Sequence, residues 1–261
     1  MRTLRLIWVF FRLGALNELQ YRVHFFVQLL QSVLGLGTAL AGLSVVFAHT
    51  STLGGWSSDQ LLGVLGVYFL VGGAINMVIQ PSMQRFMEDV RQGTLDFTLT
   101  KPADAQLLVS VQQMQIWKLI DVGLGLAVLL LALLRLAHAI GPAQAAGFVA
   151  ALLAGGAIVY SFWLILATCC FWVVRVTNIL VIFESMYTAG RWPVTIYPGA
   201  LRWALTFLVP VAFAVTVPAE SLTGRLSGLE LAEAAALAVA LIAVSRWFWL
   251  VGIRRYTGAS A

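Results

Sequence analysis

The residue types that most often carry catalysis are few in this chain and poorly placed for it. His24, His49 and His138 have neither the i, i+4 spacing nor the neighbouring carboxylates of a zinc site. Cys169 and Cys170 are adjacent, which suits buried small residues better than a disulfide. No G-x-x-x-x-G-K-[ST] phosphate loop occurs. The sequence therefore predicts no catalytic, cofactor-binding or metal-binding residue.

Charged residues within apolar segments are more informative, because a charge in hydrocarbon is costly and must face protein, water or a partner. Asp121 lies in such a segment, and Lys118 precedes it by three residues on the same helix face. We predict either a structural ion pair or a role in translocation for these two residues. Glu184 is predicted to belong to a gate or a partner-facing loop.

Uncharged polar residues near the ends of the apolar segments are further candidates. Asn76 and Gln80 end one segment, and Gln112, Gln113 and Gln115 begin the next. A polar vestibule and ordinary hydrogen bonds between helices are the two alternatives for them. The centres of the segments carry almost no charge, which argues against an ion-coupled carrier. A lipid-like, amphipathic or bulky cargo fits this pattern better.

One polar segment, residues 82–104, stands between long apolar stretches and holds seven of the 27 Asp, Glu, Lys and Arg residues. In its first half, apolar residues recur with the spacing of one helix face, at Met83, Phe86, Met87 and Val90. Gly93 stands where a left-handed cap would end this helix. Apolar and polar residues then alternate from Thr94 to Thr100, which predicts an extended tail.

Composition decides the class of protein. Apolar residues make up 61% of the chain and charged residues 10%, against about 25% charged residues in soluble domains, and the mean hydropathy is +0.91. We therefore predict an all-α polytopic membrane protein. A transmembrane helix needs roughly 20 apolar residues, and six such stretches lie at residues 23–48, 61–80, 112–135, 145–174, 201–218 and 229–251. The fifth is the weakest, because Pro210 and Pro218 interrupt it.

The first 20 residues lack the compact apolar core and cleavage site of a signal peptide. Basic and apolar residues are interleaved there, which predicts an interfacial helix before the first span. The alternative is a simple extension of that span.

The basic residues predict the orientation. With six spans, fourteen Lys and Arg residues fall on the side that holds both termini and residues 82–104, and only Arg135 and Arg225 fall on the other. The positive-inside rule then makes the termini and the loops at residues 81–111 and 175–200 cytoplasmic. The net charge of +5 follows from this topology and from attraction to anionic membrane lipid. It requires no nucleic acid partner.

The pattern Glu88-x-x-Arg91-x-Gly93-Thr94-Leu95-Asp96-Phe97-x-Leu99-x-Lys101-Pro102 resembles the ABC-2 type permeases, which carry a Glu, Gly, Leu and Pro signature between spans two and three. Residues 191–198, RWPVTIYP, and residues 210–224, PVAFAVTVPAESLTG, look like the fifth-span region of one ABC-2 subfamily. Span number, loop order and length agree with the family over essentially the whole chain.

The resemblance implies a permease domain over residues 1–261 in the bacterial cytoplasmic (inner) membrane. It implies a dimeric export path, made with a second copy or a related permease, and cytoplasmic ABC ATPase subunits that bind ATP and Mg²⁺. Residues 83–92 would be the coupling helix. Glu88 and Arg91 would make polar contacts with the ATPase or position its neighbour. Gly93 would end the helix, and Pro102 would begin the return to the membrane. The apolar ridge of Met83, Phe86, Met87 and Val90 would either fill a groove on the ATPase or pack within the permease.

Two functions of other classes compete with this prediction. An ion-coupled secondary transporter should show buried carboxylates and internal repeats, and no clear three-plus-three repeat relates the two halves. A membrane scaffold that transports nothing would use the same cytoplasmic loops.

Overall fold

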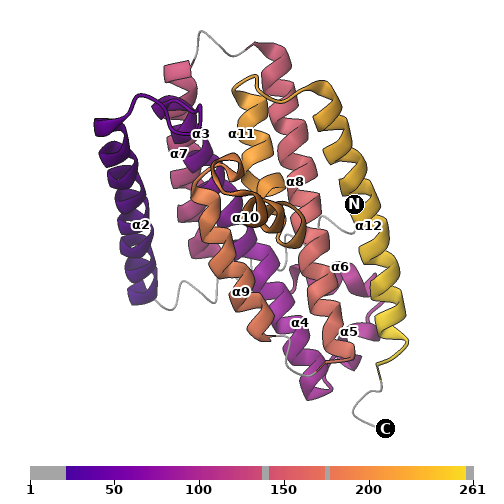
Figure 1. Cartoon of the computed structure of the whole chain (residues 1–261). Coiled ribbons are helices and arrows are strands. Elements are labelled where there is room, and N and C mark those ends of the chain that lie inside the picture. Colours follow the sequence, from indigo (N-terminus) through magenta and orange to yellow (C-terminus); the bar gives the residue numbers. More distant parts are fainter. Residues whose placement is uncertain (1–21, 137–140, 174–176, 257–261) are drawn as a thin grey trace.

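The computed structural model describes residues 22–136, 141–173 and 177–256, without the side chains of residues 22–24 and 177–181. Within these ranges the regular structure is helical, apart from one isolated bridge between Leu53 and Trp56. The predicted all-α polytopic class is confirmed (Figure 1). The predicted interfacial helix at residues 1–20 lies outside the described residues.

The α-helices are α2 (Arg22–His49), α3 (Ser58–Ala74), α4 (Gln80–Gln92), α5 (Asp96–Leu99), α6 (Ala105–Val111), α7 (Leu119–Leu136), α8 (Pro142–Thr168), α9 (Thr177–Tyr187), α10 (Gly199–Trp203), α11 (Val217–Leu222) and α12 (Gly228–Ile253). Three π-helical segments are η1 (Ile75–Ile79), η6 (Ala204–Leu208) and η7 (Ala212–Thr216). Four 3-10 segments are η2 (Ile116–Lys118), η3 (Cys169–Phe171), η4 (Thr188–Arg191) and η5 (Val194–Ile196).

Five continuous helical stretches in the described chain are long and apolar enough to cross a membrane: Phe25–His49, Ser58–Gln92, Ile116–Leu136, Pro142–Phe171 and Gly228–Ile253. They correspond to the predicted spans one, two, three, four and six. The bundle has one end that holds α4, α5 and α6, here called the α4 end (Figure 1). The opposite end, here called the Trp56 end, holds the contact of Arg225 over the Trp56 ring at 4.5 Å. The stretch α2 begins, and α12 ends, at the α4 end.

The fifth predicted span, residues 201–218, is not a straight helix. Gly199–Leu208 and Ala212–Leu222 are bent against each other by 81°. Pro210 lies at this break and has no N–H for a helical hydrogen bond, and Val209 before it is extended, as residues before proline prefer. The sequence prediction failed because apolar length alone does not distinguish a span from a bent pair.

The predicted internal loop at residues 175–200 is also corrected. The helix α9 leads away from the α4 end, and Thr195 accepts a hydrogen bond from the Trp56 indole N–H at 3.1 Å. Ile196 lies against Gly54. Residues 177–196 therefore carry the chain to the Trp56 end. The bent pair starts and finishes at that end, so it is a re-entrant segment.

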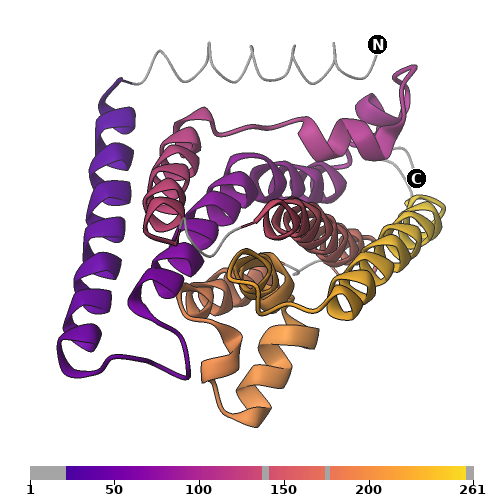
Figure 2. The ribbon, with the colours of Figure 1, turned by 90° about the horizontal axis from the view of Figure 1, so that it is seen from above.

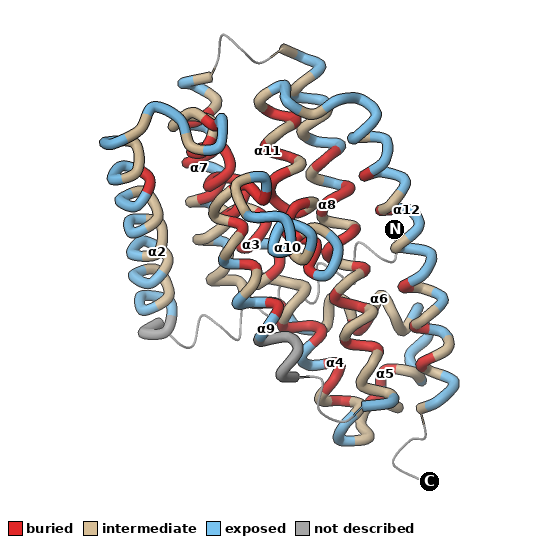
Figure 3. Tube along the Cα trace, viewed as in Figure 1, coloured by how far each residue is buried: buried red, intermediate tan, exposed pale blue. Residues whose placement is uncertain are grey.

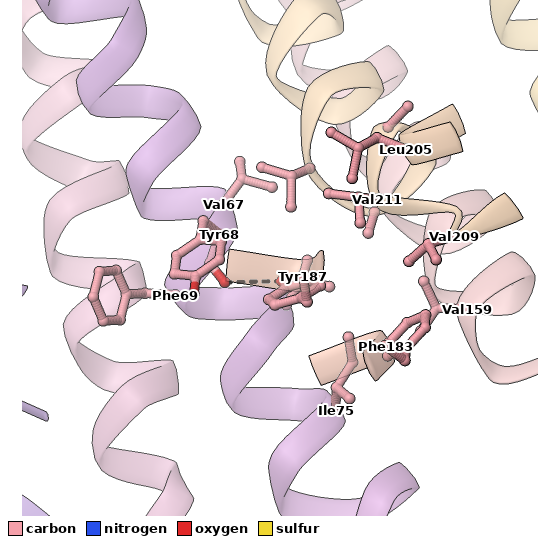
Figure 4. Packing of buried hydrophobic residues seen from close by; sticks show 14 of the residues in the cluster. Val67, Tyr68, Phe69, Ile75, Val159, Phe183, Tyr187, Leu205, Val209 and Val211 are labelled. Atoms are coloured by element: carbon pink, nitrogen blue, oxygen red, sulfur yellow. Dashed lines mark hydrogen bonds between the residues drawn. The ribbon is translucent and has the colours of Figure 1, made fainter. Parts of the chain in front are cut away.

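The core is centred on α3, the most buried of the spanning stretches (Figure 3). In Figure 4, Tyr68 of α3 stacks on Tyr187 of α9 with ring centroids 5.1 Å apart, and the Tyr187 hydroxyl donates to the Tyr68 carbonyl at 3.1 Å. Phe183 of α9 and Val211 before η7 extend this core toward the re-entrant segment. In contrast, α2 stands at the edge of the bundle (Figure 2), and only 6% of its spanning window is buried.

The helices α3 and α7 approach closely through two glycines. A Cβ on Gly66 would lie 2.7 Å from the Leu129 nitrogen, and one on Gly125 would overlap the Leu70 nitrogen. Gly66 and Gly125 thus allow the close packing that small residues give to membrane helices. Gly35 and Gly37 of α2, in contrast, have no neighbour within 4 Å of a Cβ position.

Candidate functional site

The predicted coupling helix is the continuation of span two. One helical stretch runs from Ser58 to Gln92 through the π-helical segment η1, so residues 83–92 are not a separate loop helix. π-Helical turns inside longer helices are frequent at functional sites, because they displace side chains and free backbone groups. Here the Met77 carbonyl accepts from the Gln115 N–H at 2.8 Å.

The apolar ridge of α4 faces inward. Met83 and Phe86 are fully buried and Met87 is nearly so, whereas Val90 is half-buried. The Phe86 ring packs 5.0 Å from Trp249 of α12 and 5.6 Å from Phe171 of η3. Of the two alternatives for the ridge, the structure favours packing within the permease. A groove on an ATPase cannot receive these three side chains in this conformation.

The other face of α4 is polar and open to a partner. Arg91 pairs with Glu88 at 2.7 Å, and Gln92 donates to the same carboxylate. Arg85 is half exposed on this face. Glu88 and Arg91 thus present a fixed pair of opposite charges.

The end of α4 is locked by a carboxylate to which sequence reasoning gave no role. Asp89 is 6% exposed and receives Arg85 at 3.0 Å, the Thr94 hydroxyl at 3.2 Å and the Gln112 amide at 3.3 Å. Gly93 follows with a φ of 73°, which confirms the predicted left-handed cap. The i, i+4 spacing of Arg85 and Asp89 was the available signal.

The predicted extended tail after Gly93 is wrong, because Asp96–Leu99 forms the short helix α5. Leu95 is fully buried and Phe97 is 74% exposed. The exposed ring belongs to α5, which lies at the α4 end (Figure 1).

A cavity of about 240 Å³ brings together the five predicted pathway or gate residues. Asn76 of η1, Gln80 of α4, Lys118 of η2, Asp121 of α7 and Glu184 of α9 all line it. Its remaining walls come from α2, α3 and α8. These residues are up to 108 positions apart in sequence, so the fold, and not local spacing, assembles the site.

Lys118 and Asp121 form an ion pair at 3.3 Å, with 22% and 13% of their side chains exposed. Lys118 and Asp121 therefore form a structural ion pair and also line the cavity. The three glutamines have more ordinary roles. Gln112 bonds to Asp89, and the backbones of Gln113 and Gln115 tie α7 to the second span through Ser82 and Met77.

A family model described as ABC-2 family transporter protein matches residues 33–260. The chain belongs to this family. Comparisons with curated proteins and with solved structures found no match. As an ABC-2 permease the chain is a membrane transport component and not itself catalytic, so family membership decides against the secondary-transporter and scaffold alternatives. The exposed face of α4 and the polar cavity are the two candidate functional sites of this ABC-2 permease.

Proposed function

We propose that this ABC-2 permease pairs with cytoplasmic ABC ATPase subunits and with a second permease, either a second copy or a related chain, to export a lipid-like, amphipathic or bulky substrate. In this proposal the partner ATPase binds ATP and Mg²⁺. The permease supplies the path and a mechanical link to it.

The observation that carries the proposal is the continuity of the second span with α4. Glu88 on the exposed face and Asn76 at the cavity belong to one helical stretch. Twelve residues separate them, which is roughly 18 Å at 1.5 Å per residue. A displacement of the exposed face is therefore transmitted along a single helix to the wall of the cavity.

In the proposed mechanism, the walls of the cavity move relative to one another. Closure of the ATPase subunits on ATP moves α4 as a lever, with Glu88 and Arg91 as the contact. Asn76 and Gln80 move with it, relative to the Lys118–Asp121 pair on the third span and to Glu184 on α9. The relative motion of these walls opens the path toward the far side of the membrane.

The orientation proposed is that of a bacterial cytoplasmic membrane protein with both termini in the cytoplasm. The α4 end carries exposed basic residues at Arg85, Arg91, Lys101, Arg254 and Arg255. Because residues 177–196 lead to the Trp56 end, Arg191 and Arg202 are counted with the basic residues of that end and not with those of the α4 end. The asymmetry still favours the α4 end as the cytoplasmic side.

The test is gentle purification of the tagged chain from its native membrane, with mass spectrometry of the bound proteins. We expect an ABC ATPase to be recovered with the wild type and lost with Glu88→Arg. The double variant Glu88→Arg with Arg91→Glu restores a pair of opposite charges and should recover part of the ATPase. Glu233→Arg makes the same charge change on an exposed residue of α12 at the Trp56 end and should have no effect. An oligomer free of ATPase in several mild detergents would contradict the proposal.

A further inference from the structure

A second cavity lies along α2, nearer the Trp56 end. Its volume is about 200 Å³, and its walls include Thr38 and Gly42 of α2, Leu61 and Leu65 of α3, and Arg191 of η4. Most of the residues that line it are apolar. Arg191 is the charged residue that lines the cavity among the described side chains.

Arg191 has no counter-ion among the described side chains, and its Nε is buried without a hydrogen-bond partner. Its guanidinium lies 5.6 Å from the centre of the Tyr68 ring, a contact that stabilises the charge but uses none of its N–H donors. Arginine stays protonated in proteins, so an unpaired guanidinium in an apolar cavity favours binding of an anion.

We infer that this cavity binds the acidic group of an anionic membrane amphiphile, with Arg191 as the counter-ion. The cavity lies inside the seam between α2 and the bundle, and α2 is apolar and largely uncovered, with Phe26, Leu30 and Val45 each at least 60% exposed. A molecule that is already in the membrane can enter such a seam with its apolar part facing hydrocarbon. A carboxylate from a second protein chain would have to reach past α2 into the seam.

The seam continues along α2 from the second cavity toward the first, which has polar walls. One face of α2 lines both cavities, from Gln28 beside the first to Gly42 beside the second. That distance is roughly 21 Å at 1.5 Å per residue. Tyr68 lines the first cavity, and its ring contacts Arg191, which lines the second.

The experiment is native mass spectrometry of the purified chain, titrated with dioleoyl phosphatidylglycerol and with dioleoyl phosphatidylcholine. The two lipids share their tails and differ in net charge. We expect the wild type to prefer the anionic lipid by roughly tenfold, the size of one good charge-assisted contact. Arg191→Gln should abolish the preference and leave phosphatidylcholine binding unchanged. Arg254→Gln, which removes an exposed charge at the α4 end, should keep it.

A second variant tests the site without touching the charge. Gly42 has no neighbour within 4 Å of a Cβ position, so Gly42→Leu can fill the seam and should reduce binding of the anionic lipid. Unchanged preference in both Arg191→Gln and Gly42→Leu would overturn the inference. So would displacement of the lipid by excess inorganic phosphate, or a loss of dimer in Arg191→Gln without a loss of lipid. The ATPase is absent from this assay, so its outcome is independent of the proposed function.

Discussion

Gly93 and Asp89 together determine where the α4 lever ends. The Thr94 N–H donates to the Asp89 carbonyl at 2.9 Å, and the Asp89 carboxylate holds the Thr94 hydroxyl and the Gln112 amide. The chain can make this turn because residue 93 has a φ of 73°, where glycine has no steric cost. A defect at either residue would release the lever from α6.

Replacing Gly93 with alanine should lower the free energy of unfolding by about 1 kcal/mol, because a Cβ is strained at positive φ. The measurement is a denaturant titration in mild detergent. Gly156→Ala is the matched control, since Gly156 lies within α8 and has open space around it. The control should be neutral or stabilising by up to about 1 kcal/mol. Equal effects of the two changes would contradict the assignment of Gly93 as a left-handed cap.

The ion pair between Asp104 and Arg246 makes the stability of the fold depend on pH. Arg246 of α12 donates to both its carboxylate oxygens, at 2.7 and 3.1 Å, and these hydrogen bonds hold the pKa of the Asp104 carboxyl below its ordinary value. A lowered pKa in the folded state stabilises the fold above the ordinary carboxyl pKa of about 3.9, and this contribution is lost as the pH falls through the lowered value.

We therefore expect Asp104→Asn to lower the free energy of unfolding at pH 7 by no more than about 1 kcal/mol, since both partners are nearly half exposed. The difference between wild type and variant should shrink toward pH 3. Denaturant titrations at both pH values check this, and a difference that stays constant would argue against the pair.

Among the elements, α3 and α7 pack closely against each other, and glycine makes this contact possible. Gly125 sits directly on the backbone of α3 near Leu70, whereas Gly123, two residues earlier in α7, has open space at its Cβ position. Gly123 and Gly125 thus belong to the same helix but have different surroundings.

This difference predicts that Gly125→Ala destabilises the protein by about 1 to 3 kcal/mol, the usual cost of overpacking. Gly123→Ala should be neutral or slightly stabilising, because alanine favours helix. Thermal unfolding of both variants in the same detergent measures the contrast. If Gly123→Ala were the more damaging change, the packing of α3 on α7 would be incorrectly described.

Sequence patterns identified the straight spans, because their apolar runs match the length of a helix across a membrane. They failed at the fifth crossing. The run at residues 201–218 is apolar but broken near Pro210, whereas α9, which helps to make the crossing, is short and contains Asn178, Glu184 and Ser185. Hydropathy therefore favoured the wrong segment.

The candidate site was predicted in part. Asn76, Gln80, Lys118, Asp121 and Glu184 stood out as polar residues in or beside apolar segments, and the fold gathers them around one cavity. The inward direction of Met83, Phe86 and Met87 could not be predicted, because an amphipathic pattern gives a face but not its partner. The unpaired state of Arg191 depends on tertiary contacts alone.

As a whole, the molecule combines a packed bundle with a loosely attached helix. The spans around α3 share a buried core, whereas α2 stands apart (Figure 2). Both cavities are lined by residues of α2. The second span crosses the bundle and extends to the exposed face of α4. In the proposed mechanism, motion at the α4 end reaches the cavity along this helix.

The most direct test follows the reactivity of a single cysteine at the cavity. Asn76→Cys is placed in a chain in which Cys169 and Cys170 are replaced by alanine, and its maleimide reaction rate is measured with the ATPase bound, with and without ATP. We expect ATP to change the rate several-fold and the addition of Glu88→Arg to remove this change. A rate that is the same with and without ATP, while the bound ATPase hydrolyses ATP, would show that α4 does not transmit motion to the cavity.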